Sequence, residues 1–271
     1  MTRKSPKTTG DRATIASFFG EEVELLPGLP LRFTRPPTKP PACLALLDLT
    51  VLAEHLTAEK AKQEAPSSLL SVAEQSRYAG FTYPKRQHEW LGGRLTCKFA
   101  VLHLAAPQAH ITMPALSVLP AENGAPRISC PSLPTWSLPA VSISHSDRYV
   151  VAMAARAGAC GIDLQKTTAQ TVRVADRFAE PAEILLLREY LPELAEPQRL
   201  TLLWAAKEAL KKGLLHDQPV VFQGVTLQSL TRADNLILQL RYPGDRGRPA
   251  AIILEALDDY FLAYTIAPDH A

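Results

Sequence analysis

Two acids and a lysine in the second half of the sequence are of the types that bind a divalent cation and a phosphate. Asp163 lies in the run ACGIDLQ (159–165), and Glu208 follows it by 45 residues. Glu208 lies four residues after Trp204 and four before Lys212, so these three share one face of a helix. Two carboxylates can share a hard cation such as Mg²⁺, which usually takes one or two acids plus waters and substrate phosphates. The alternative is a surface Glu–Lys pair, which supports a helix by only about 0.2–0.5 kcal/mol.

The segments that carry these residues predict strands followed by helices. Alternation in ACGIDLQ puts Ile162 and Leu164 on one face of a strand and Asp163 and Gln165 on the other. A helical pattern over 171–191 is interrupted near Pro181, and a stronger one covers 196–215. Further strands are predicted at 140–146, 148–155, 235–243, 250–257 and 260–268.

The first half mixes the same kinds of element. CLALLDLT (43–50) predicts a buried strand, and the stretch from Pro84 to about residue 105 predicts a helix with Leu91, Leu95 and Phe99 on one face. Prolines crowd the residues before 43 and those from 119 to 140, so we expect an extended arm and a loop there. The expected division is an N-terminal arm over 1–42, an N-terminal half over 43–140 and a C-terminal half over 141–271.

A basic stripe is expected on the helix that starts at Pro84. Arg86, Arg94 and Lys98 recur at eight- and four-residue spacing, beside the glycines Gly92 and Gly93. The plain interpretation is a solvated helix face. Because glycine lets a ligand come close to the backbone, the stripe can also bind a polyanion.

Three segments in the second half form an ordered set. SISHS (142–146), GIDLQ (161–165) and WAAKEALKK (204–212) resemble the three signature segments of the Sfp-type 4′-phosphopantetheinyl transferases. EWLGGRLTCK (89–98) resembles the upstream helix of that family, and GAP (124–126) resembles its Gly-x-Pro turn near the adenine. Each motif is weak by itself, but their order and spacing over residues 43–267 are specific.

The resemblance implies an α+β fold of two similar halves related by a pseudo-two-fold axis, with the active site and coenzyme A in the cleft between them. It implies transfer of the 4′-phosphopantetheine arm of coenzyme A to a serine of an acyl or peptidyl carrier protein, with release of adenosine 3′,5′-bisphosphate. The partners are then coenzyme A and a carrier protein, and the cofactor is Mg²⁺. Since two fused halves can build the cleft within one chain, we expect a monomer.

The resemblance also assigns catalytic roles by motif position. Asp163 and Glu208 hold Mg²⁺ against the pyrophosphate, and Lys212 neutralises or protonates the leaving phosphate. Phosphoryl transfer needs positioning and charge neutralisation more than covalent catalysis, which suits these residue types. Glu208 can also act as general base for the incoming serine, and the sequence leaves both roles open.

The coenzyme is expected to contact residues of both halves. By motif position, His145 and Ser144 contact its phosphate oxygens, and Pro126 lies near its adenine. Arg86 and Arg94 of the basic stripe are further candidates for binding its phosphates.

Two positions depart from the family pattern. Gln165 stands where many members carry a second acid. An amide can still orient a metal-bound water or bind weakly to a metal, so Gln165 joins Asp163 and Glu208 as a metal-site residue, but it brings no negative charge. In RFAEPAE (177–183) the acid after the phenylalanine is displaced by one residue, so Glu183 or Glu180 replaces it, or both are solvated charges at a helix end. The alternative function is therefore a degenerate member that binds coenzyme A or a carrier protein without turnover.

Composition excludes several other classes. The chain has 271 residues, 46% of them hydrophobic, and a formal charge of only +2, so neither nucleic acid nor a membrane surface is an expected partner. Its four cysteines are far apart and show no zinc-binding spacing. Since no stretch is apolar enough for a signal peptide or a membrane span, we expect a cytoplasmic protein.

Overall fold

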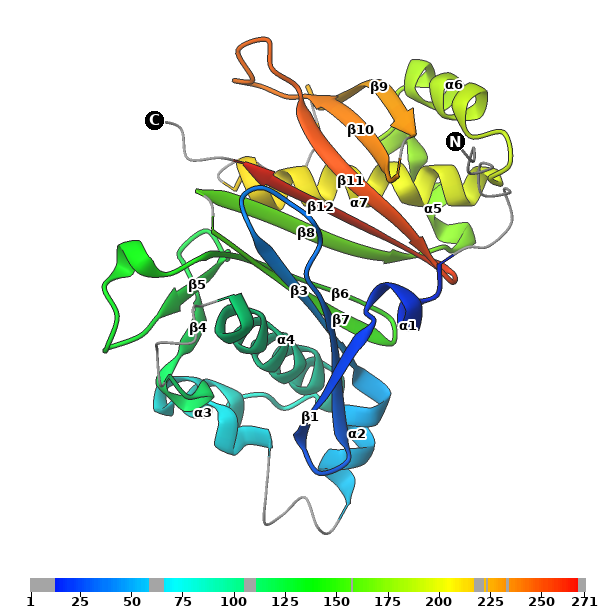
Figure 1. The fold of residues 1–271 in the computed structure, drawn as a ribbon. Helices are drawn as coiled ribbons and strands as arrows, with labels where there is room; N and C mark the ends of the chain where they lie inside the picture. The colour runs from blue at the N-terminus through cyan, green and yellow to red at the C-terminus, as the bar shows by residue number, and fades with distance from the viewer. Residues whose placement is uncertain are drawn as a thin grey trace, which may run out of the picture.

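The architecture consists of two antiparallel sheets, each packed against one long helix (Figure 1). The computed structural model describes residues 13–58, 66–104, 111–156, 158–216, 222, 224–232 and 234–267. Within these residues both sheets have five strands, and a separate two-stranded sheet joins β4 (Ser117–Pro120) to β5 (Pro126–Ser129). The mixed α+β fold expected from the sequence is confirmed.

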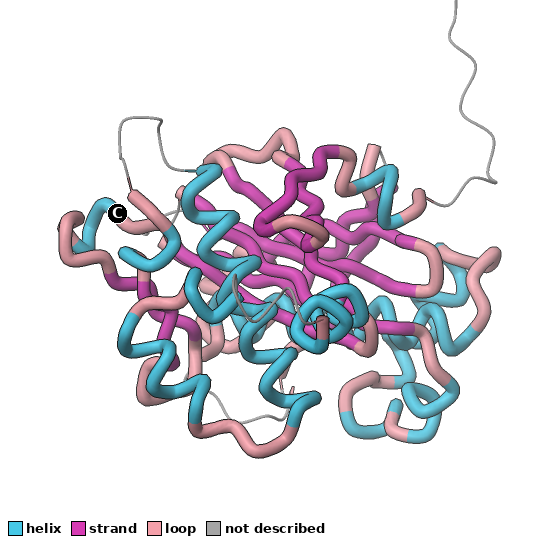
Figure 2. Tube along the Cα trace, turned by 90° about the horizontal axis from the view of Figure 1, so that it is seen from below, coloured by secondary structure: helices cyan, strands magenta, loops and turns pink. Residues whose placement is uncertain are grey.

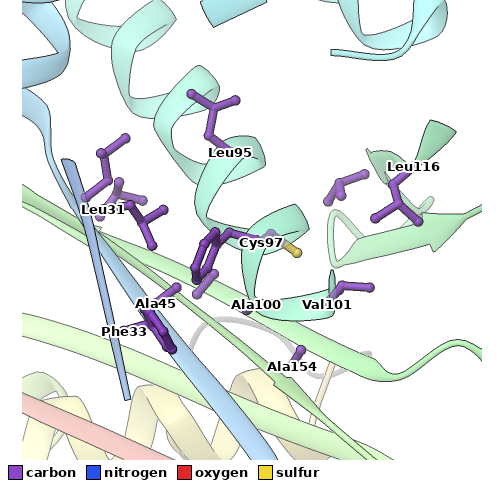
Figure 3. Close-up of a cluster of buried hydrophobic side chains, with 14 of the residues drawn as sticks. Leu31, Phe33, Ala45, Leu95, Cys97, Ala100, Val101, Leu116 and Ala154 are labelled. Atoms are coloured by element: carbon purple, nitrogen blue, oxygen red, sulfur yellow. The ribbon is translucent and has the colours of Figure 1, made fainter. Parts of the chain in front are cut away.

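The first sheet has the strand order β1-β2-β3-β7-β6. Its strands are β1 (Glu21–Leu26), β2 (Leu29–Thr34), β3 (Ala42–Asp48), β6 (Ala140–Ser146) and β7 (Tyr149–Ala155). Helix α4 (Pro84–Leu104) packs on it with Leu91, Leu95 and Phe99 buried, which confirms the predicted helix and its apolar face. Figure 3 shows part of this core, where Leu95 and Cys97 lie on α4 and Phe33 and Ala45 lie at the strands. The other elements of this half are α1 (Ile15–Phe18), α2 (Leu49–Thr57), α3 (Val72–Ala79), η2 (Pro66–Leu69), η3 (Met113–Ala115) and η4 (Thr135–Ser137).

The second sheet has the order β8-β12-β11-β10-β9. Its strands are β8 (Ala159–Lys166), β9 (Thr226–Arg232), β10 (Leu236–Arg241), β11 (Ala250–Leu257) and β12 (Tyr260–Ala267). Helix α7 (Glu196–Leu214) covers it, and its closest neighbours are β8 and β12. The remaining elements are α5 (Ala169–Arg173), η5 (Ala175–Arg177) and α6 (Pro181–Tyr190), and Pro181 occupies the first turn of α6, as suits a helix start.

A third core lies between the two sheets. Leu44 and Leu46 of β3 join Ile162 and Leu164 of β8 in this core, whereas Cys43, Ala45 and Leu47 face α4. Strand β3 is therefore buried on both faces, which explains its unbroken apolar run. Figure 2, the view from below, shows helices lying over the grouped strands.

Part of the expected N-terminal arm is a hairpin. Residues 21–34 form β1 and β2, and Leu29 and Leu31 are fully buried in the core of the first half. The expectation of an extended connector is therefore wrong for these residues. Pro30 lies in β2, the neighbour of the edge strand β1, between the buried side chains of Leu29 and Leu31. The first sheet also includes β6 and β7, so it continues past the expected division at residue 140.

The paired glycines of α4 bring the helix close to the sheet. A Cβ on Gly92 would lie 2.9 Å from Leu49 Cδ2 and 3.0 Å from Val150 Cγ1, and one on Gly93 would lie 3.2 Å from Ile143 Cγ2. These glycines face buried side chains, so the expectation that a polyanion approaches the backbone here is wrong. They serve helix–sheet packing instead.

Within the described part of the chain, each half contains one buried lysine–glutamate ion pair. Lys98 of α4 pairs with Glu74 of α3, and both side chains are 0% exposed. Lys207 of α7 pairs with Glu183 of α6 at 2.8 Å, with exposures of 1% and 2%. Lys98 therefore belongs to no basic stripe, and Glu183 is no solvated helix-end charge, which corrects both expectations.

The two ion pairs sit in the same hydrogen-bond pattern. In each half the lysine Nζ also donates to a backbone carbonyl 29 residues earlier in the chain. The glutamate carboxylate accepts from two backbone N–H groups, one three residues before it and one 44 residues after it. These groups are Leu69, Ser71, Glu74, Lys98 and Val118 in the first half, and Phe178, Glu180, Glu183, Lys207 and Leu227 in the second. The halves are built around the same buried polar unit, at a constant spacing along the chain.

This duplication predicts matched stability losses. Lys98→Met and Lys207→Met each leave a buried carboxylate without its cation, so each variant should lose about 3–5 kcal/mol of unfolding free energy. Urea unfolding measures the loss, and Lys211→Met, on the same helix as Lys207 but only partly buried, should change it by less than about 1 kcal/mol. A Lys207→Met protein as stable as the Lys211→Met control would contradict the burial of this pair.

Candidate active site

Asp163 is the centre of a hydrogen-bonded network between β6, β8 and α7. It lies on β8 and is 1% exposed. Its Oδ1 accepts from Ser144 Oγ at 2.7 Å and from Lys212 Nζ at 2.6 Å, and its Oδ2 accepts from Gln165 Nε2 at 2.9 Å. A buried carboxylate needs such partners to replace the hydrogen bonds that water would otherwise make. The structure therefore brings together residues of β6, β8 and α7.

Glu208 lies one helical turn before Lys212 on α7 and faces the same region. Burial raises the pKa of Glu208, and the nearby charge of Asp163 raises it further, whereas Lys212 and Lys211 lower it. Two carboxylates from different elements thus lie close enough to repel each other. Such a pair favours either a shared proton or a bound cation.

The close approach of α7 to β8 depends on two glycines. A Cβ on Gly161 would lie 1.9 Å from the carbonyl oxygen of Ala209, and one on Gly213 would lie 3.2 Å from the nitrogen of Gly161. Helix and strand backbones are therefore in direct contact. This contact sets the distance between Asp163, two residues from Gly161, and Lys212, next to Gly213.

His145 lies at the rim of the network. Its side chain is 51% exposed, and its Nδ1 is 3.8 Å from Glu89 Oε1 on α4. Partial burial lowers the pKa of His145, and Glu89 opposes that shift, while Lys212 and Asp163 are close enough to influence it. The same Glu89 oxygen lies 3.9 Å from Lys85 Nζ. The rim thus offers an imidazole and a lysine from the first half.

The remaining expected binding residues lie outside the Asp163 network. Arg94 donates from Nε to Val118 O at 3.2 Å, and its guanidinium carbon lies 4.4 Å from the ring centroid of Trp90. Arg86 is exposed in the first turn of α4, and Pro126 begins β5. Arg94 is therefore engaged in packing within the first half, whereas Arg86 is open to solvent.

A pocket of about 650 Å³ adjoins the network. Lys85 of α4 and Ser146 of β6 line it from the first half, and Gln165, Thr171 and Trp204 line it from the second. Because Gln165 both lines the pocket and donates to Asp163, the pocket and the carboxylate network share a wall. Both halves of the fold contribute to this space.

The donor set at Asp163 suits a hard cation. Among the described residues, no group of three or more His, Cys, Asp or Glu side chains is placed to hold a metal. A metal here would be held by Asp163 and Glu208, with the Gln165 amide beside them and the rest of its shell from water or phosphate. That is the usual coordination of Mg²⁺ in phosphoryl-transfer sites, so the residues fit this ion.

Sequence reasoning missed several residues that build the site. Gly161 and the Lys207–Glu183 pair hold α7 against the sheet, and Glu89 contacts His145. The signal for the ion pair was the equal spacing of a glutamate and a lysine in the two halves, which becomes visible only when the halves are aligned. Gly161 and Glu89 lie within the segments GIDLQ and EWLGGRLTCK, but nothing in the local sequence indicates the contacts that they make.

No helix among the described residues has the length and apolarity needed to cross a membrane.

Comparison with known proteins agrees with this geometry. No curated protein matches the chain. Residues 159–264 match the model of the 4′-phosphopantetheinyl transferase superfamily. This segment contains Asp163, Gln165, Glu208 and Lys212, so the part of the chain that carries the Asp163 network is similar to the 4′-phosphopantetheinyl transferase superfamily.

Proposed function

We propose that this protein is an Sfp-type enzyme that transfers the 4′-phosphopantetheine arm of coenzyme A to a serine of an acyl or peptidyl carrier protein, in a Mg²⁺-dependent reaction that releases adenosine 3′,5′-bisphosphate. The observation that carries the proposal is the Asp163 network. It places a buried carboxylate against Lys212 and near Glu208, within the segment that matches the superfamily.

The chain's own residues account for the charge changes of this reaction. The serine oxygen forms a bond to the phosphorus that carries pantetheine, and the bond from that phosphorus to the adenosine 5′-phosphate oxygen breaks. Glu208, whose pKa is raised, can accept the serine proton near neutral pH. The side chain of Lys212 is 28% exposed, and its Nζ can donate a hydrogen bond or a proton to the leaving phosphate. Magnesium, held by Asp163 and Glu208, would supply neutralisation of the pyrophosphate charge.

The decisive experiment is the mass of a candidate apo carrier protein after incubation with coenzyme A, Mg²⁺ and this protein. We expect an increase by one phosphopantetheinyl group at the acceptor serine. The competing proposal, binding without turnover, is favoured by Gln165, which brings no charge to the metal. Coenzyme A binding with no mass change in acyl and peptidyl carriers would support that alternative.

Two further observations support the cellular location and the oligomeric state that we propose. The four cysteines are buried and unpaired, as suits a reducing cytoplasm. The pocket beside Asp163 is lined by both halves of one chain, which supports a monomeric enzyme.

We expect coenzyme A to bind at least about tenfold more tightly than dephospho-coenzyme A, because one charge-assisted contact contributes roughly 1.5–3 kcal/mol. Arg86, an exposed cation, and His145, an exposed imidazole, are the candidates for this contact with the phosphate. Calorimetric titration of both ligands measures the preference, and His145→Ala or Arg86→Ala should reduce it without changing the Mg²⁺ dependence. Equal affinity of the wild-type protein for the two ligands would reject the phosphate assignment.

The melting temperature of the Gln165→Glu variant should depend on Mg²⁺. The Gln165 amide nitrogen lies 2.9 Å from Asp163 Oδ2, so a glutamate there brings two carboxylates together. Like-charge repulsion should lower the melting temperature of the metal-free variant, and Mg²⁺ should restore it. Thermal unfolding with chelator and with excess Mg²⁺ tests this, with Gln228→Glu, an exposed position on β9 outside the pocket, as the matched control. A variant that unfolds at the same temperature in both conditions would show that residue 165 lies away from the metal.

A further inference from the structure

Three serines of β6 join the two sheets at their edges. Strand β6 is an edge of the first sheet and β8 is an edge of the second. Ser142, Ser144 and Ser146 accept hydrogen bonds through Oγ from the backbone N–H groups of β8, at 3.1, 3.3 and 3.0 Å. Each donor lies 20 residues after its serine: Ile162, Leu164 and Lys166. This serine row, defined by Ser142, Ser144 and Ser146, satisfies edge N–H groups that would otherwise lack partners.

Ser144 has a second hydrogen bond that sets it apart within the serine row. Its hydroxyl donates to Asp163 Oδ1 at 2.7 Å while it accepts from Leu164 N, and the residue is 5% exposed. A hydroxyl carries a single proton, so this donor is already committed. Since the hydroxyl donates its hydrogen bond to Asp163, it has none left to donate to a phosphate oxygen. This disfavours the expected role of Ser144 as a phosphate ligand.

We propose that Ser144 is a positioning residue for Asp163. Its oxygen fixes β8 against β6 through Leu164 N, and its proton fixes Oδ1 of the neighbouring carboxylate. One side chain thereby links the strand register to the orientation of Asp163 towards Lys212. Ser142 and Ser146 perform only the first task, which makes them matched controls for stability and Mn²⁺ affinity. Ser146 also lines the pocket beside Asp163, so Ser142 alone is the control for the reaction rate.

The number of hydrogen-bond acceptor sites left free on the Asp163 carboxylate agrees with this role. A carboxylate offers about four acceptor sites, and Ser144, Lys212 and Gln165 occupy three. Loss of the Ser144 donor would leave Oδ1 held by the long, partly exposed Lys212 side chain alone. The carboxylate would then sample several orientations, and its affinity for a cation would fall.

The test compares Ser142→Ala, Ser144→Ala and Ser146→Ala, and it relies on the proposed function only for the rate of carrier modification. Mn²⁺ binding is followed by electron paramagnetic resonance, with and without coenzyme A. Calorimetry gives the affinities for coenzyme A and dephospho-coenzyme A, and thermal unfolding gives stability. All three variants should melt a few degrees lower, because each leaves a backbone N–H without its acceptor. Only Ser144→Ala should lose about tenfold or more in Mn²⁺ affinity, with the preference for coenzyme A unchanged. Its kcat should also fall about tenfold or more relative to Ser142→Ala, which lies away from the pocket. Ser144→Thr, which keeps a hydroxyl, should retain Mn²⁺ affinity.

Three results would overturn the proposal. In the first, Ser144→Ala loses the preference for coenzyme A over dephospho-coenzyme A while its Mn²⁺ affinity is unchanged, which makes Ser144 a phosphate ligand. In the second, all three alanine variants behave alike. In the third, the wild-type protein binds no Mn²⁺. A wild-type protein that binds Mn²⁺ but modifies no carrier would instead reject the proposed function, and the Mn²⁺ titration would still decide the role of Ser144.

Discussion

Asp163→Asn should lower the rate of carrier modification at least about a hundredfold while the protein stays folded, the scale observed when a group that acts on a transition state is removed. The change keeps the shape of the side chain but removes the charge that a cation and Lys212 share. Lys212 is partly exposed, so its ammonium can turn to water and the fold should tolerate the loss. Coenzyme A should still bind in the absence of metal.

Mass spectrometry of the carrier at several Mg²⁺ concentrations measures this effect, with circular dichroism as the check on folding. Asp176→Asn, an exposed acid of η5, is the control and should leave the rate unchanged. Glu208→Gln should lose activity in the same way but should stabilise the metal-free protein. Since the pKa of Glu208 is raised in the folded chain, keeping it ionised near neutral pH costs folding free energy. Near wild-type modification by Asp163→Asn would show that Asp163 holds no catalytic metal.

The long helices and the acid-bearing strand could be predicted from sequence because local patterns encode them. Pro84 and the spacing of Leu91, Leu95 and Phe99 predict α4, which the structure confirms over Pro84–Leu104. Strict alternation around Asp163 predicts which face of β8 carries the acid, and the opposite face is indeed buried between the sheets. In these elements one periodicity dominates the packing.

The buried lysines could not be predicted in the same way. A lysine inside a helical pattern is predicted to be a surface residue, since an unpaired charge is almost never buried. Lys207 is buried because Glu183 lies beside it and Phe178 O accepts from the same nitrogen, at 2.7 Å. These partners come from elements distant in the chain, so the compensation is tertiary. The role of Ser144 was hidden for the same reason, because its partners belong to another sheet.

Gly161 is the residue whose change should disturb the site most through geometry alone. In Gly161→Ala the new methyl would lie 1.9 Å from Ala209 O, a backbone atom that no rotamer change can move. Helix α7 must therefore shift away from β8, and Lys212 and Glu208 shift with it. A misplacement of about 1 Å at a catalytic group can cost about a hundredfold in rate. We expect a loss of that size, together with a stability loss of about 3 kcal/mol or more from overpacking.

Gly93→Ala is the matched control on the other long helix. Its methyl would meet Ile143 Cγ2 at 3.2 Å, and a side chain can yield by a few tenths of an ångström. Both variants should be compared by urea unfolding and by carrier modification at a temperature where each is folded. The expected result is a severe loss for Gly161→Ala and a change of less than about threefold in rate for Gly93→Ala. Equal behaviour of the two variants would show that the contact between α7 and β8 does not set the geometry of Asp163, Glu208 and Lys212. Because the effect acts through helix position, added Mg²⁺ should not rescue Gly161→Ala, whereas it should partly offset a simple loss of metal affinity.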